Sequence, residues 1–213
     1  MSVKNRRFAV LICCFIFGLS SSLAEIKGTK ISNESNEIQK TSSIVDDAFV
    51  AQNISVPDIS LVRQDGKKAL LPQEFDQGKP VLLTFIFTSC KAVCPIMSHL
   101  MKSVQNKLGK RANEIQMASI SLDPEYDTPE RLTQYSQKMG AERQWIHYTG
   151  LVDDVVKLER AFGIYRGDKM NHLSVLFIRR SPKESWLKFT GFVESDKLIK
   201  ELGLEVETDY TNH

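Results

Sequence analysis

The sequence predicts an α/β fold, a single domain with a central mixed sheet flanked by helices. Three observations point to it. Residues 81–87 follow Pro80 as a continuous apolar run, which is typical of a central strand covered on both faces. Residues 95–108 then carry apolar side chains at four-residue spacing, which is a helical pattern. The same order of strand and helix recurs further along the chain. With 213 residues, 42% of them hydrophobic and 25% charged, the chain is long enough to bury a core.

The other elements follow in order along the chain. Asp65-Gly66 is a turn signal between two apolar stretches and predicts a hairpin. Thr128 before Pro129 predicts the start of a helix, because threonine caps helices and proline fits their first turn. The expected series is strands 59–62 and 69–71, strand 81–87, helix 95–108, strand 116–122, a helix from 128, helix 151–162, antiparallel strands 173–178 and 186–192, and helix 195–202. This is the order of a thioredoxin-like domain.

The N-terminal segment 1–24 is interpreted as a signal peptide. Three basic residues precede an apolar stretch over 8–19, and the small residues Ser22 and Ala24 stand before the expected cleavage point. An uncleaved membrane anchor is the alternative, although a spanning helix needs about 20 apolar residues. Export to the periplasm is therefore expected. Loss of Lys4, Arg6 and Arg7 with the signal changes the net charge from +2 to −1, which argues against nucleic-acid binding.

The remaining chain divides by composition. Residues 25–55 are rich in serine, asparagine, lysine and glutamate, and are predicted to form a polar, flexible leader. The folded domain is expected over 56–205, and residues 206–213 form a C-terminal tail.

Two of the four cysteines lie inside the predicted signal, so the mature chain keeps Cys90 and Cys94. They stand between a predicted central strand and its helix, where functional groups of α/β sheets lie in a crevice. At a four-residue spacing on one helical face, their Cβ atoms would lie about 5 to 6 Å apart. That distance suits a shared metal ion, and a disulfide after modest adjustment. A helix N-terminus also favours the thiolate, which serves metal binding and nucleophilic attack alike.

Several uses of this pair remain open. A static disulfide would close a very short loop and stabilise little, although an oxidising compartment favours disulfides. A structural zinc site would require four protein ligands. Peroxide reduction fits less well, because Thr88 stands two residues before Cys90 instead of three. A redox pair and a metal site are the preferred interpretations.

Four stretches of the sequence resemble a known family. They are FTSCKAVCP at 87–95, SLDPEYDTPERL at 121–132, FGIY at 162–165 and MNHLSVLFI at 170–178. Over about 56–204 the chain resembles the Sco/SenC family of thioredoxin-fold copper-binding proteins, which help assemble the copper centre of cytochrome c oxidase. Lys91 and Leu173 depart from the residues that the family often has beside its ligands.

The resemblance implies a ligand set and a partner. Cys90 and Cys94 match the family's two thiolate ligands, and His172 matches its distant imidazole ligand. Two soft sulfurs select Cu(I), while imidazole suits either copper oxidation state. Asp123 is either a loop-capping residue or a residue that orients the site. The partner would be a copper-receiving oxidase subunit.

The other histidines, His99, His147 and His213, are interpreted as surface or core residues. Met97 and Met101 are expected to fill gaps in the core, and Met170, which lies near His172, stays open. Two functions follow from these assignments. One is a periplasmic copper chaperone, and the other is a thiol-disulfide oxidoreductase in which one cysteine attacks a disulfide of a protein partner and the other resolves the mixed disulfide.

Overall fold

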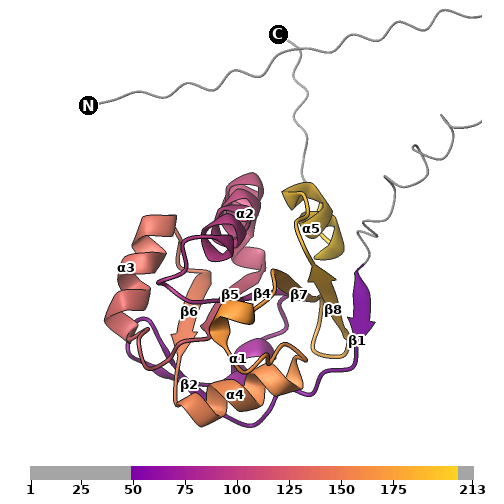
Figure 1. Ribbon diagram of the computed structural model, residues 1–213. Helices are drawn as coiled ribbons and strands as arrows, with labels where there is room; N and C mark the ends of the chain where they lie inside the picture. Colours follow the sequence, from indigo (N-terminus) through magenta and orange to yellow (C-terminus); the bar gives the residue numbers. More distant parts are fainter. Residues whose placement is uncertain (1–48, 206–213) are drawn as a thin grey trace, which may run out of the picture. The chain divides into compact units, whose positions relative to one another are not determined.

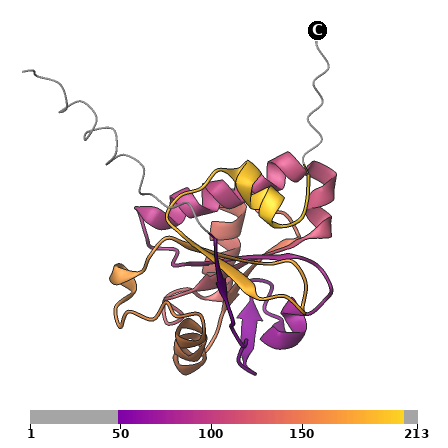
Figure 2. The ribbon, with the colours of Figure 1, turned by 90° about the vertical axis from the view of Figure 1, so that its right-hand side faces the viewer.

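The computed structural model describes residues 49–205, which form a three-layered α/β domain. An eight-stranded mixed sheet lies between α2, α3 and α5 on one face and α1 and α4 on the other (Figure 1). Figure 2 shows the same layers from the side. The strands are Val50–Gln52 (β1), Ser60–Arg63 (β2), Lys68–Leu70 (β3), Val81–Ile86 (β4), Gln116–Ser121 (β5), Trp145–Thr149 (β6), Val175–Arg179 (β7) and Trp186–Thr190 (β8). The α-helices are Leu71–Phe75 (α1), Val93–Leu108 (α2), Pro129–Met139 (α3), Val152–Ala161 (α4) and Ser195–Glu201 (α5), and two short 3-10 helices span Gly109–Glu114 (η1) and Lys169–Asn171 (η2).

The strand order is β1-β8-β7-β4-β5-β6-β2-β3. Strands β4, β5 and β6 run parallel, while β7 pairs antiparallel with β4. In this register Ile86 lies opposite Ser121, and Thr84 lies opposite Leu176. The carboxyl ends of β4 and β5 and the start of β7 therefore lie side by side at the same end of the strands.

The core lies on both faces of the central strands. Every residue of β4 is buried, and alternate side chains point to opposite faces. Leu82 and Ile86 pack with the side chains of α2, whereas Leu83 and Phe85 pack with those of α4. The expectation of an α/β domain with helices on both sides of a mixed sheet is confirmed, including the continuous apolar run as a central strand.

Two strands differ from the expectations. Residues 145–149 are not among the expected strands, but they form β6, an interior strand between β5 and β2. Strand β1 lies upstream of the expected domain start at Val56. It pairs with β8, and the ring of Phe49 packs at a tilt against that of Phe189, with ring centroids 5.1 Å apart. The last residues of the predicted leader thus belong to the sheet. The predicted signal peptide 1–24, the leader up to residue 48 and the tail 206–213 lie outside the described residues.

Candidate metal centre

Three predicted site residues lie together at the end of the sheet where β4 ends and β7 begins. They are Cys90, Cys94 and His172. Cys90 lies in the loop after β4, and Cys94 lies in the first turn of α2. His172 lies three residues before β7. The antiparallel pairing of β7 with β4 brings the histidine to the cysteines across a separation of 78 residues from Cys94.

The geometry of the three side chains suits one shared ion. A ligand atom from each lies within 4.8 Å of the others, and Cys94 Sγ lies 3.4 Å from His172 Nε2. Both cysteines are free thiols. The two cysteines were expected to share one helical face. Helix α2 begins at Val93, however, so Cys90 precedes the helix and this expectation is wrong. The loop over 87–92 brings the sulfurs together instead.

His172 is oriented by a hydrogen bond to its own loop. Its Nδ1 lies 2.8 Å from the carbonyl oxygen of Lys169, which can only accept, so Nδ1 carries the proton. The lone pair of Nε2 then faces Cys94. The ring also meets Phe87 edge to face, with ring centroids 5.1 Å apart. An imidazole held in this tautomer is ready to donate to a metal.

The two thiols differ in their electrostatic surroundings. Burial raises the pKa of Cys94 to about 12, and nearby charges add to this effect. For Cys90, burial acts in the same direction, but hydrogen bonds from the backbone of Cys94 and Ala92 outweigh it and lower the pKa. Cys90 is half-buried, whereas Cys94 is 1% exposed. The more accessible sulfur is therefore also the better nucleophile.

Asp123 lies next to the histidine loop and not against the ligand atoms. Its carboxylate pairs with the ammonium group of Lys169, the residue whose carbonyl accepts the His172 hydrogen bond. Its backbone N–H also donates to Ser121 Oγ at 2.9 Å. The Asp123 side chain therefore contacts the loop that carries His172, and its predicted roles in loop capping or in orienting the site stay predictions.

Asp127, which was not predicted from the sequence, is fully buried four residues after Asp123. Its carboxylate accepts hydrogen bonds from Thr88 at the end of β4 and from Ser121 at the end of β5. The only signal in the sequence was the second aspartate of DPEYD. It was overlooked because the local sequence does not distinguish an aspartate in an exposed loop from a buried one.

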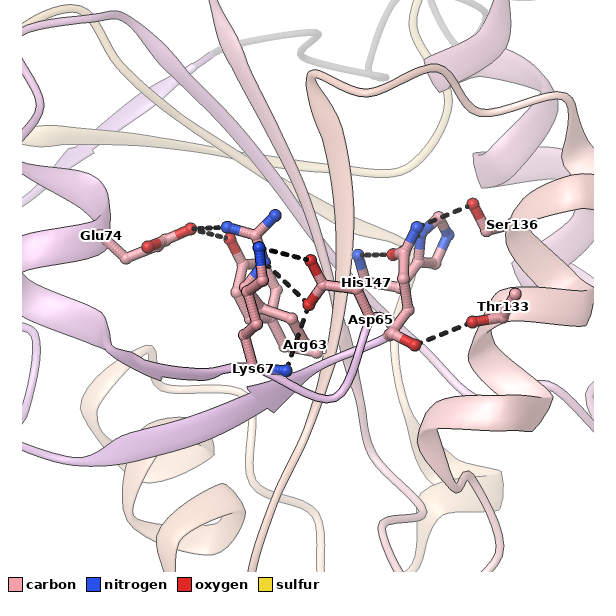
Figure 3. Close-up of polar contacts among 9 residues, drawn as sticks. Arg63, Asp65, Lys67, Glu74, Thr133, Ser136 and His147 are labelled. Carbon is pink, nitrogen blue, oxygen red and sulfur yellow. Dashed lines mark hydrogen bonds and ion pairs between the residues drawn. The ribbon is translucent and has the colours of Figure 1, made fainter.

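Over residues 49–205, His99 and His147 do not belong to the group of ligand atoms. His147 is fully buried in β6 and stacks on Trp145 with ring centroids 5.3 Å apart, and burial lowers its pKa to about 3. Figure 3 shows His147 in a network of polar contacts that includes Ser136 and Thr133. His99 is exposed on α2, and His213 lies outside the described residues. As expected, Met97 and Met101 are core side chains. Met170 is 68% exposed, two residues before His172.

A cleft of about 550 Å³ opens beside the ligand set. His172 and Asp123 lie on its wall, and Glu159 of α4 lines it as well. Burial raises the pKa of Glu159 to about 7. Of the three ligand residues, only His172 lines this cleft, together with several ionisable side chains.

Comparison with known proteins agrees with this geometry. The sequence profile of the SCO1/SenC family matches residues 51–202. The chain belongs to the SCO1/SenC family. Several curated relatives carry Sco names. A SCO1 protein homolog of Bacillus subtilis is 36% identical over 84 residues, which cover 39% of this chain and 42% of the relative. A mitochondrial SCO1 homolog of Arabidopsis thaliana is 24% identical over 185 residues, which cover 83% of this chain and 54% of the relative.

The alignments thus cover about half of the length of these relatives.

Solved Sco structures share the fold. BsSco, described as a member of the Sco family of cytochrome c oxidase assembly proteins, superposes with a TM-score of 0.62 at 25% identity, covering 73% of this chain and 95% of that one. Copper-bound ScoI of Bradyrhizobium japonicum superposes with a TM-score of 0.58 at 20% identity, covering 72% and 98%. Within residues 49–205 of this SCO1/SenC chain, no helix has the length and apolar character needed to cross a membrane.

Proposed function

We propose that this protein is an exported, periplasmic copper chaperone that holds copper through Cys90, Cys94 and His172. The observation that carries the proposal is the convergence of two thiols and one imidazole within 4.8 Å at the end of β4. Thiolates are soft ligands that select Cu(I), and an imidazole serves both copper oxidation states. A structural zinc site would call for a fourth protein ligand.

The comparisons support the same assignment. Relatives of similar fold have been solved with copper bound, and BsSco is described as belonging to a family of cytochrome c oxidase assembly proteins. We therefore expect the client to be a copper-receiving oxidase subunit. Transfer would proceed by exchange of ligands between the two sites, which requires an accessible thiol, and Cys90 is the more accessible of the pair.

Anaerobic titration of the reduced domain with Cu(I) tests the proposal. One tight equivalent is expected, and Cys94→Ser should weaken binding by orders of magnitude because it removes a soft ligand. Binding of no copper by the parent would refute the chaperone function.

The imidazole should matter more for Cu(II) than for Cu(I). His172→Ala is expected to weaken Cu(II) binding strongly and Cu(I) binding less, because the two thiolates still satisfy the softer ion. His99→Ala is the matched control, since His99 is exposed on α2 outside the ligand set. Unchanged Cu(II) affinity in His172→Ala would remove His172 from the ligand set.

A second function is favoured by the difference between the two thiols. Cys90 has a lowered pKa and is partly exposed, as an attacking thiol requires. Buried Cys94 is placed to resolve the mixed disulfide that Cys90 would form with a partner. The Cys90 thiolate would attack a partner disulfide and release one partner thiolate. Cys94 would then displace the second, leaving the partner reduced and the Cys90–Cys94 pair oxidised. Reduction of a model disulfide substrate by the metal-free dithiol, lost in Cys90→Ser, would support this function.

A further inference from the structure

Exposed apolar side chains gather at the end of the sheet that carries the ligand set. Within residues 49–205, eight large apolar side chains are exposed, and all but Val50 lie at the carboxyl end of the parallel strands. In the described domain, the loops at the opposite end of these strands carry none. Exposed apolar surface that is concentrated in one place is typical of an interaction site. The seven side chains are those of Ile96, Tyr126, Leu151, Val152, Met170, Leu173 and Phe192.

Four of the seven border the ligand set and are called the apolar rim here: Ile96, Met170, Leu173 and Phe192. Met170 and Leu173 lie on either side of His172 in the same short segment, and they are 68% and 42% exposed. Ile96 follows Cys94 by two residues at the start of α2 and is 50% exposed. Three members of the rim are therefore fixed to the ligand residues by the chain itself.

Phe192 joins the rim through the pairing of β7 with β8. The N–H of Gly191 donates to the carbonyl oxygen of Ser174 at 2.9 Å, just beyond the last paired residues of the two strands. The two segments therefore still run side by side at Leu173 and Phe192. An exposed phenylalanine thus lies next to the segment that carries His172.

The charge beside the rim is positive and unpaired. Lys91 is exposed in the loop between the two cysteines, directly after Cys90. Among the ion pairs of residues 49–205, none includes Lys91. Lys169, on the histidine loop, differs because its ammonium group pairs with Asp123. A partner that covers this end of the sheet would therefore meet apolar side chains and one free ammonium group.

Copper exchange requires close contact at this place. A receiving protein must bring its own ligands to Cys90, so it must also cover Lys91 and the adjacent rim. Covering exposed apolar side chains favours association when the partner surface is apolar as well. A lysine that loses water in such an interface needs an opposite charge.

We propose that the apolar rim and Lys91 form the docking surface for the copper-receiving protein, which presents an apolar patch and a carboxylate opposite Lys91. The inference rests on the proposed copper-chaperone function. A membrane with anionic lipids also offers apolar and negative groups, but it has no ligands to take copper from Cys90. A protein partner is therefore favoured over a lipid surface.

Copper transfer to two acceptors tests the rim. The protein loaded with one equivalent of Cu(I) is mixed with the soluble copper-binding domain of the oxidase subunit from the same organism, or with a small Cu(I) chelator. Phe192→Ala and Leu173→Ala should each slow transfer to the protein acceptor about fivefold or more. Both should leave transfer to the chelator unchanged, because neither residue is a ligand. Val50→Ala, at an exposed apolar residue outside the rim, is the matched control.

A charge reversal tests the expected carboxylate of the partner. Lys91→Glu should slow transfer to the protein acceptor about tenfold at low ionic strength, because an attraction becomes a repulsion. Added salt should slow the parent and speed this variant, since it screens both effects. Lys183→Glu makes the same change of net charge at the opposite end of the sheet and should behave as the parent.

Each remaining outcome is decisive. A parent that binds no copper would refute the proposed function itself, whereas normal copper binding with equal transfer rates in all variants would refute only the docking surface. Should Phe192→Ala fail to fold, Ile96→Ser supplies the same comparison. Binding of the parent to phosphatidylglycerol vesicles, or a dimer in sedimentation analysis, that is lost in Phe192→Ala would assign the rim to a membrane or to a second copy and overturn the inference.

Discussion

At the scale of single residues, the site combines two thiols of unequal reactivity. Backbone hydrogen bonds lower the pKa of Cys90 against the opposing effect of burial, while burial raises that of Cys94 to about 12. At neutral pH the thiolate population should therefore be carried by Cys90. This asymmetry suits copper exchange, in which one ligand must be displaced first, and disulfide exchange alike.

Alkylation of the reduced, metal-free domain should show the asymmetry. With iodoacetamide at pH 7, Cys90 is expected to react about tenfold or more faster than Cys94, because it is both more accessible and more readily ionised. Peptide mass spectrometry over time measures the two rates. The difference should vanish in urea, where both thiols are exposed. Equal rates in the folded domain would contradict the assigned roles.

At the scale of elements, the connection between β6 and α4 depends on close packing against β2. A Cβ atom built on Gly150 would lie 2.6 Å from Cδ2 of Leu61, which is fully buried in β2. Glycine is therefore required here for space and not for its backbone freedom.

Gly150→Ala is expected to lower the free energy of unfolding by about 1–3 kcal/mol, because it overpacks the contact with Leu61. Urea denaturation measures the loss. The control is the same substitution in a Leu61→Ala background, where the clashing atom is absent and most of the additional cost should disappear. Additive losses in the double variant would show that the contact is not the cause.

Helix α4 carries a second testable feature, the carboxyl group of Glu159 in the cleft beside His172. Burial raises its pKa from 4.5 to about 7 in the folded protein. Below about pH 4.5 the Glu159 carboxyl group is protonated in both the folded and the unfolded state, so its ionisation does not affect the free energy of unfolding. As the pH rises from 4.5 to 7 the unfolded state ionises first, and stability falls until the folded state ionises too.

Glu159→Gln should therefore stabilise the domain above pH 7 and have no pH-linked effect near pH 4. Because the side chain is partly exposed, the expected gain is about 1 kcal/mol after allowance for solvent screening. Thermal unfolding at both pH values measures it. A gain of equal size at pH 4 would point to a cause other than ionisation.

At the scale of the whole molecule, ligands from two segments far apart in the sequence link metal binding to folding. Cys90 and Cys94 follow β4, whereas His172 precedes β7, and the three come together only in the folded sheet. A ligand that binds the folded state better than the unfolded state raises the stability of the whole domain.

Copper at a hundredfold excess over its dissociation constant should stabilise the domain by about 2.7 kcal/mol. For a domain of this size that corresponds to roughly 5 to 11 °C in Tm. Differential scanning calorimetry of the reduced protein under anaerobic Cu(I) measures the shift. Cys94→Ser should lose most of it, and an equal shift in that variant would place the copper elsewhere.

The sequence by itself determined the fold class and part of the site. A run buried on both faces, as over 81–87, can be recognised because apolar side chains are continuous there. The two cysteines were found because they stand where that strand gives way to a helix. His172 was reached only through the family resemblance, since nothing in its local sequence separates it from His99 or His147.

The tertiary structure alone decided how these parts meet. The interior place of β6 and the pairing of β1 with β8 depend on partners distant in sequence, and a short mixed strand has the same local pattern at an edge or in the middle of a sheet. Burial of Asp127 likewise depends on Thr88, which lies 39 residues away. His172 meets Cys94 because β7 runs antiparallel to β4 in one register, and that register is set by packing across the whole sheet.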